Sequence, residues 1–214
     1  ADVNFDLTER LRLSVGARYT QDEKTGTVFR ANYLGAGRTP LTGGAAATPL
    51  LVRTDYTNTR DYSQFTPRIS LSYDLNEDLT GYVSFSQGFK SGGFDMRGDA
   101  IFTPDTVNGY DPETVDSYEI GLKGSAFGGL MNFSSAIFYS EYSDQQVTTQ
   151  VPAPGGIASF VDNVGSSTIY GAEFEATVFL ADNLTAFVSL GYLEASFDEF
   201  IRFNIGTGQF ENIS

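Results

Sequence analysis

The feature that most constrains this chain is a repeated alternation of apolar and polar residues with a period of two. Around Val83, apolar or small residues fill every second position from 79 to 85, and mostly hydroxyl-bearing residues or glycine lie between them. Because successive side chains of a strand point to opposite faces, each such run predicts a β-strand with one apolar and one polar face. The runs lie near 11–24, 64–75, 79–90, 114–124, 129–142, 167–180 and 184–198.

The lengths of the runs and of their connections narrow the fold class. With a weaker run at Val3–Leu7 there are about eight strands, most of them longer than the ~5–6 residues of a globular strand and suited to the ~9–11 residues that cross a bilayer. Short turns near 8–10, 76–78, 126–128 and 182–183 alternate with long connections near 25–61, 91–113 and 143–166. Outer-membrane barrels sort their connections in this way. The sequence therefore predicts an all-β, antiparallel, up-and-down transmembrane β-barrel.

Tyrosines on the apolar faces allow two interpretations. They would form the aromatic girdles of a barrel at the membrane interfaces, or they would pack in the core of a soluble sheet. The tyrosines concerned are Tyr19, Tyr73, Tyr118, Tyr139, Tyr170 and Tyr192.

Charge and composition exclude several function classes. The net charge of −14 disfavours nucleic acid as a partner, since such binding depends on Lys and Arg. The chain has no Cys and no His, and it lacks a nucleophile elbow and a phosphate-binding glycine loop. We therefore predict no enzyme activity, no catalytic residues, no cofactor and no metal site. Acidic groups at Asp105, Asp111, Glu113 and Asp116, and at Glu194, Asp198 and Glu199, lack EF-hand spacing and are interpreted as solvated.

Several segments, in this order, resemble the barrel of TonB-dependent outer-membrane receptors. They are Ser86–Phe94 (SQGFKSGGF), Pro112–Gly124 (PETVDSYEIGLKG), Tyr139–Ser143 (YSEYS), Asn163–Gly165 (NVG), Tyr170–Glu175 (YGAEFE) and Gly191–Phe197 (GYLEASF). The resemblance implies a barrel of about 22 strands, a plug domain, and import driven by the TonB complex. The implied cargo is a ferric siderophore, haem, vitamin B12 or an oligosaccharide.

About eight strands are fewer than such a barrel contains, and we find no plug-like sequence, TonB box, signal peptide or terminal aromatic residue. We therefore expect residues 1–214 to be an internal piece of a receptor barrel in the outer membrane of a Gram-negative bacterium, without its plug domain. The implied partners are outer-membrane lipid, a small-molecule ligand such as a ferric siderophore, and the TonB complex through the missing plug.

Two sets of residues are candidates for contact with ligand or lumen. Aromatic and cationic residues near the long connections could bind an anionic, catecholate-like or sugar ligand, or could pack within their own loops. They are Phe89, Lys90, Phe94, Arg97, Tyr110 and Tyr142. Charges on the polar faces would face a wet lumen, or would pair across strands. They are Arg12, Arg18, Arg68, Glu119, Lys123, Glu173 and Glu175.

Two alternatives stay open at this point. Eight strands could close into a small outer-membrane barrel with a structural or adhesive role, although such barrels are filled by bulky inward side chains. The chain could also be a soluble β-sandwich that binds a ligand, in which case its apolar faces would meet in an interior.

Overall fold

The computed structural model describes residues 1–33, 49–154, 156–204 and 206–214. Within these ranges the chain forms nine strands and one short 3₁₀ helix. The strands are β1 (Asp2–Asp6), β2 (Leu11–Tyr33), β3 (Pro49–Asn76), β4 (Leu79–Lys90), β5 (Glu113–Ala126), β6 (Met131–Ala153), β7 (Gly156–Ala181), β8 (Leu184–Asn204) and β9 (Gln209–Asn212), and the helix is η2 (Pro104–Asn108). In these described ranges, no helix is long and apolar enough to cross a bilayer.

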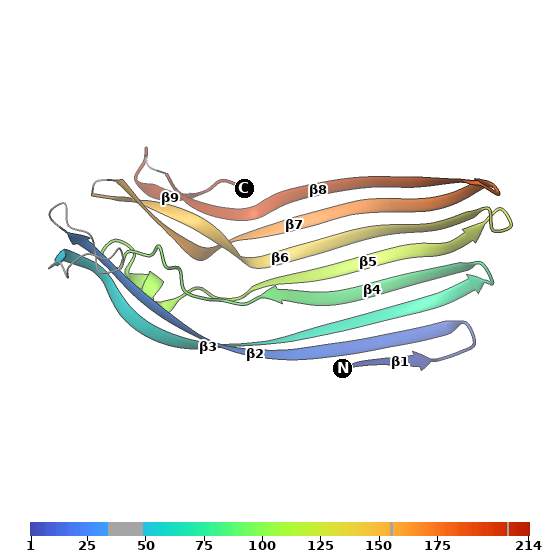
Figure 1. Ribbon diagram of the computed structural model, residues 1–214, viewed down its shortest axis with the longest axis horizontal. Coiled ribbons are helices and arrows are strands. Elements are labelled where there is room, and N and C mark those ends of the chain that lie inside the picture. Colours follow the sequence, from blue (N-terminus) through green and yellow to red (C-terminus); the bar gives the residue numbers. More distant parts are fainter. Residues whose placement is uncertain (34–48, 155, 205) are drawn as a thin grey trace.

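All strands lie in one antiparallel sheet in sequence order, from β1 to β9 (Figure 1). Among the described strands, β1 and β9 do not pair with each other, so the sheet is an open wall and not a closed small barrel. The described chain likewise has no second sheet facing the first, which removes the sandwich alternative. The predicted up-and-down antiparallel fold class is confirmed.

The apolar face of this sheet is exposed. Val83, Ile120 and Ile137 sit side by side on neighbouring strands and keep 47%, 55% and 63% of their surface accessible. Among the described residues, the buried apolar side chains are only Val28, Tyr62, Ala158 and Ala176. A face this apolar requires a nonaqueous neighbour, and we call it the outer face.

The six tyrosines predicted to line that face are all exposed, which rules out packing in a core. Tyr118 and Tyr139 are register partners with ring centroids 6.5 Å apart, and Phe85 lies 5.1 Å from Tyr118 on the other side. Such a row of rings on adjacent strands is the geometry of an interfacial aromatic girdle.

Two of the three long connections are largely strand, which corrects the boundaries expected near 25–61 and 143–166. Strands β2 and β3 stay paired through Thr27↔Thr57 and beyond, and β6 and β7 stay paired to Ala153↔Gly156. The alternation fades there because the outer face of a hairpin beyond the bilayer meets water and no longer has to be apolar. Outward threonines pair across the strands instead, with Oγ1 atoms of Thr25 and Thr59 2.8 Å apart. Residues 34–48 of the first connection lie outside the described residues.

The third connection, residues 91–112, contains the 3₁₀ helix and is otherwise irregular, as expected. Figure 1 shows it between the two tall hairpins β2–β3 and β6–β7, which extend past the ends of β4 and β5. We call this end of the sheet the hairpin end. The opposite end carries the short turns.

Candidate functional site

Residues 91–112, hereafter the inner loop, lie on the polar face of the sheet at the hairpin end. Lys24 Nζ donates to the Gly92 carbonyl at 2.6 Å, and Asn58 Nδ2 donates to the Val107 carbonyl at 2.6 Å. Gly26 allows close approach, because a Cβ built there would lie 2.6 Å from the Phe94 ring. The inner loop therefore packs on the polar faces of β2 and β3.

The β6–β7 hairpin holds the inner loop from the other side. The two N–H groups of Gln146 Nε2 are shared among the carbonyls of Lys90, Ser91 and Asp111, which lie 3.3, 3.1 and 3.0 Å away. Asn163 accepts from the Asp111 N–H at 2.7 Å and donates to its carbonyl at 2.9 Å. Amide side chains of this hairpin thus form hydrogen bonds with the backbone at both ends of the inner loop.

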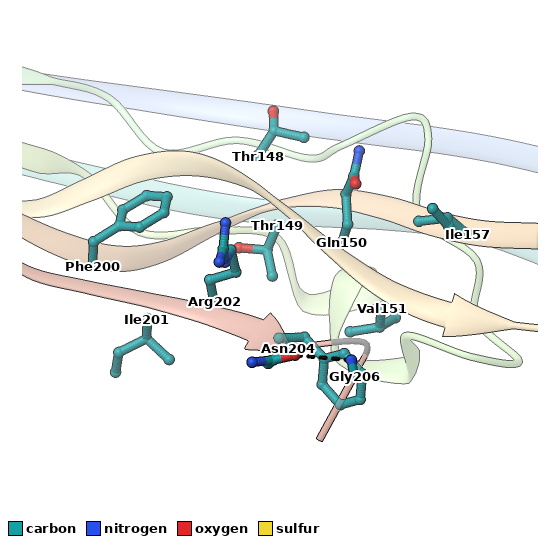
Figure 2. Close-up of a pocket in the computed structure, with 11 residues that line it drawn as sticks. Thr148, Thr149, Gln150, Val151, Ile157, Phe200, Ile201, Arg202, Asn204 and Gly206 are labelled. Atoms are coloured by element: carbon teal, nitrogen blue, oxygen red, sulfur yellow. Dashed lines mark hydrogen bonds between the residues drawn. The ribbon is translucent and has the colours of Figure 1, made fainter. Parts of the chain in front are cut away.

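Two hollows open at the hairpin end between these elements. The first, of about 350 Å³, lies between the β6–β7 hairpin and the end of β8 and includes Thr148, Gln150, Phe200 and Arg202 (Figure 2). The second, of about 560 Å³, we call the aromatic cavity. Its walls include Phe102, Phe160, Phe203 and Phe210, with carboxylates at Asp105 and Asp162. Aromatic walls with a few polar groups are typical of small-molecule sites.

The predicted ligand residues do not line either hollow. Phe94 packs over Gly26 and lies 6.1 Å from the Tyr56 ring, and Tyr110 covers Gly93. The Arg97 guanidinium pairs with Asp95 at 2.9 Å, and Lys90 Nζ lies 3.7 Å from Glu113 Oε2. Phe89 shares the outer face of β4 with Val83, whereas Tyr142 lies on the inner face of β6. Their direct role in ligand binding stays a prediction.

The cavity-lining aromatics are residues that sequence reasoning missed. Phe102, Phe160 and Phe203 come from three segments far apart in the chain, and no spacing in the sequence links them. The sequence shows an aromatic residue in each of these polar segments, but it does not show that their side chains line one cavity.

The predicted lumen charges lie on the polar face and are partly paired across strands. Arg12 Nε contacts Asp6 Oδ1 at 3.0 Å, and Arg68 Nε contacts Asp2 Oδ1 at 3.1 Å. Glu119 accepts from the Tyr82 hydroxyl at 2.7 Å. The others, Arg18, Lys123, Glu173 and Glu175, are exposed on the same face. Pairing across strands and exposure on the polar face therefore both occur, and contact with a wet lumen stays a prediction.

Three of the four acidic residues predicted near the inner loop have a hydrogen-bond or ion-pair partner, and the fourth, Asp105, lines the aromatic cavity. Asp111 contacts Arg60, Glu113 accepts from the Gln146 N–H at 2.9 Å, and Asp116 accepts from Gln87 at 2.7 Å. In the part of the chain that the structure describes, no three such carboxylates gather as metal ligands would.

Asp95 is a titratable group of the inner loop whose pKa is shifted by its contacts. Burial raises the pKa of its carboxyl, but hydrogen bonds from the Arg97 side chain, the Arg97 N–H and the Val161 N–H outweigh burial and lower the pKa below 3.8. Asp95 therefore stays charged in the folded protein at any physiological pH and bonds two different segments.

The sign of this shift predicts a pH dependence of stability. A carboxylate whose pKa is lowered by folding stabilises the fold above its ordinary value, and that contribution is lost as the pH falls through the folded value. We expect Asp95→Asn to lower the melting temperature of the full-length protein in detergent at neutral pH, with the difference shrinking below pH 3.8. A difference that is the same at every pH would contradict this assignment.

A single antiparallel sheet with an exposed apolar face, girdle tyrosines and a polar inner face defines the wall of a membrane β-barrel. The chain matches the family described as "TonB dependent receptor-like, beta-barrel" over residues 1–212 and belongs to it. Members of this family are transport receptors and not enzymes, and they lie in the outer membrane of Gram-negative bacteria.

Curated relatives match over part of the chain. The ferric-pyoverdine M114 receptor PbuA of a Pseudomonas species is 31% identical over 94 residues, which is 41% of this chain and 10% of that protein. The ferripyoverdine receptor of Pseudomonas aeruginosa is 30% identical over 79 residues, which is 37% of this chain and 9% of that protein. The aligned part is therefore about a tenth of each relative.

Solved structures show the same fold at low identity. The ferric yersiniabactin uptake receptor FyuA from Yersinia pestis has a TM-score of 0.69 and 17% identity, covering 92% of this chain and 26% of that one. The copper transporter OprC has a TM-score of 0.62 and 17% identity, covering 91% and 28%. The ferripyoverdine receptor of P. aeruginosa, bound to ferripyoverdine, has a TM-score of 0.59 and 18% identity, covering 98% and 23%.

Proposed function

We propose that the protein carrying this segment is an outer-membrane receptor that captures a ferric siderophore at the hairpin end and imports it with energy from the TonB complex. The observation that carries the proposal is the aromatic cavity at the hairpin end of a transport-receptor barrel wall. Ferripyoverdine receptors among the relatives favour a siderophore over the other cargoes of the family.

Each partner in this proposal would contact a different part of the barrel wall. The outer face contacts outer-membrane lipid, the hairpin end faces the outside, and the short turns face the periplasm. The inner face of β2 to β8 would contact a plug domain, through which the receptor would engage the TonB complex.

The proposal is tested by uptake. The full-length protein is expressed in an iron-starved strain that lacks its own siderophore receptors, and the cells receive ferripyoverdine, ferric yersiniabactin, haem or vitamin B12. We expect uptake of a ferric siderophore that disappears when TonB is deleted. Uptake of haem or vitamin B12 alone, or uptake that does not depend on TonB, would contradict the proposal.

Removing an aromatic wall of the cavity is expected to weaken capture. Phe160→Ala should raise the dissociation constant for the transported ferric siderophore by about tenfold or more, because buried aromatic anchors carry much of the energy of an interface. The measurement is binding of radioactive ferric complex to whole cells. Phe127→Ala is the matched control, because Phe127 is 77% exposed in a short turn at the opposite end. An equal loss in both variants would argue against the cavity.

A further inference from the structure

The inner loop carries two buried carboxylates that the aromatic cavity does not use. The side chain of Asp99 is 0% exposed and that of Asp95 is 7% exposed. A buried charge is costly unless it is paired and hydrogen-bonded, so each carboxylate must be held by specific partners. Those partners lie on different hairpins.

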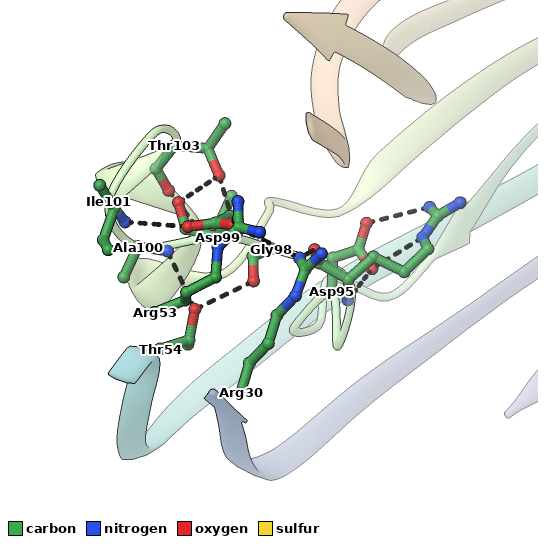
Figure 3. A network of polar contacts seen from close by, with 11 residues as sticks. Arg30, Arg53, Thr54, Asp95, Gly98, Asp99, Ala100, Ile101 and Thr103 are labelled. Atoms are coloured by element: carbon green, nitrogen blue, oxygen red, sulfur yellow. Dashed lines mark hydrogen bonds and ion pairs between the residues drawn. The ribbon is translucent and has the colours of Figure 1, made fainter. Parts of the chain in front are cut away.

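Asp99 bonds the inner loop to the β2–β3 hairpin. Its Oδ2 contacts Arg53 Nη2 and lies 3.7 Å from Arg30 Nη1 (Figure 3). Its backbone carbonyl accepts from Thr103 Oγ1 at 2.9 Å, which closes the turn that leads into the 3₁₀ helix. The Arg53 guanidinium also stacks over the Phe102 ring at 5.2 Å, so this ion pair touches a wall of the aromatic cavity.

A β-bulge aims Arg53 at the loop. Arg30 pairs with Thr54 and Ala31 pairs with Val52, which leaves Arg53 without a partner in the ladder. In a regular strand Arg53 and Thr54 would point to opposite faces, but a bulge re-aims a side chain. Both residues therefore reach the loop, where Thr54 Oγ1 donates to the Gly98 carbonyl at 3.2 Å and accepts from the Ala100 N–H at 3.0 Å.

Asp95 bonds the loop to the opposite hairpin. Its Oδ2 accepts from the Val161 N–H at 2.6 Å, while Arg97 grips both carboxylate oxygens at 3.1 and 2.9 Å. Arg97 in turn donates to Thr148 Oγ1 at 3.3 Å, and its carbonyl accepts from Arg30 Nη1 at 2.8 Å. The two carboxylate sites are thus joined through Arg30.

We propose that Asp99 and Asp95 are positioning residues that latch the inner loop between the two tall hairpins. In the latched state Phe102 to Thr106 forms a fixed wall of the aromatic cavity. Neither carboxylate lines that cavity, so both act on capture through the loop. The part of the proposal that concerns ligand rests on the proposed function, whereas the latch itself does not.

The latch is tested without ligand by thiol labelling. This chain has no cysteine, so Val28→Cys supplies its one thiol, and any cysteine in the rest of the full-length protein is first replaced by serine. Val28 is 5% exposed and lies on the inner face of β2, two residues from the glycine on which the Phe94 ring packs. In the full-length protein, adding Asp99→Asn should speed labelling by a water-soluble maleimide by about tenfold or more, because an unpaired Arg53 favours local opening.

Asp55→Asn is the matched control, because Asp55 is an exposed carboxylate of the same hairpin and should leave the labelling rate unchanged. Asp99→Glu keeps the charge and should restore slow labelling at least in part. An unchanged labelling rate in Asp99→Asn, with the protein correctly inserted, would overturn the latch.

Capture of radioactive ferripyoverdine by whole cells supplies the second measurement. At equal receptor levels, Asp99→Asn should weaken capture by about tenfold, and Asp99→Glu should recover part of it. Faster labelling with unchanged capture would overturn the positioning role. If the unmodified receptor captures none of the ferric siderophores in the uptake panel, the proposed function fails, while the labelling rates still decide whether the latch exists.

Discussion

Val83→Arg is expected to destabilise the full-length barrel by about 2–4 kcal/mol, the cost of a cation on the lipid face near the bilayer midplane. Val83 lies between Leu71 and Ile120 on neighbouring strands, and 47% of its surface is exposed. In lipid, the arginine has no water or carboxylate beside it. The measurement is the free energy of unfolding in urea of the protein refolded into lipid vesicles.

Ser84→Arg is the control for that substitution. Ser84 is the next residue of β4 and points to the inner face, where its register partner is Glu119. An arginine there can pair with the carboxylate and remain hydrated, so its cost should stay within about 0.5 kcal/mol. Equal destabilisation by the two variants would mean that the faces of β4 do not differ in environment.

Gly171→Ala is expected to destabilise the barrel by about 1–3 kcal/mol, the usual cost of overpacking. A Cβ at Gly171 would lie 2.3 Å from the Tyr192 carbonyl oxygen and 2.6 Å from the Phe138 ring, which covers this glycine across the β6–β7 pair. A carbonyl of the neighbouring strand cannot swing away as the end of a side chain can. The same unfolding measurement gives the size of the effect.

Gly191→Ala provides the comparison within the same sheet. Gly191 lies on β8 opposite Glu173, and a Cβ built there meets nothing within 4 Å. This variant should be neutral or slightly stabilising, because alanine loses less backbone entropy than glycine on folding. If Gly171→Ala lowers the free energy of unfolding no more than Gly191→Ala does, the result would contradict the close packing of β6, β7 and β8 around Gly171.

The part of the fold that lies in lipid could be predicted from sequence because lipid imposes a strict pattern. At Val83 and Tyr118 the apolar side must face hydrocarbon and the other side must face water, so period two is preserved residue by residue. Pro67 lies inside β3, although a proline weakens a strand interior. It pairs with Ala17 just beyond the point where β4 stops pairing with β3, so one side of β3 has no partner there.

The hairpin end could not be predicted to the same extent. Above the girdle the outer face meets water, so it carries polar residues such as Thr25 and Thr27, and the apolar–polar alternation is lost although both belong to β2. The latch depends on a bulge that re-aims Arg53, and a one-residue shift of register leaves no trace in composition or spacing. Contacts such as that of Arg53 with Asp99 join segments more than 40 residues apart, and only the three-dimensional arrangement brings them together.

The environment of the two faces of β4 is the most direct test of this account. Single cysteines at positions 83–86 of the full-length receptor in vesicles would carry nitroxide labels, and collision rates would be measured with oxygen, which concentrates in lipid, and with a water-soluble nickel chelate. Labels at 83 and 85 should collide mainly with oxygen, and those at 84 and 86 mainly with the chelate. Labels at 83 and 85 that are shielded from oxygen, or that meet the chelate as often as those at 84 and 86, would contradict a lipid-facing barrel wall.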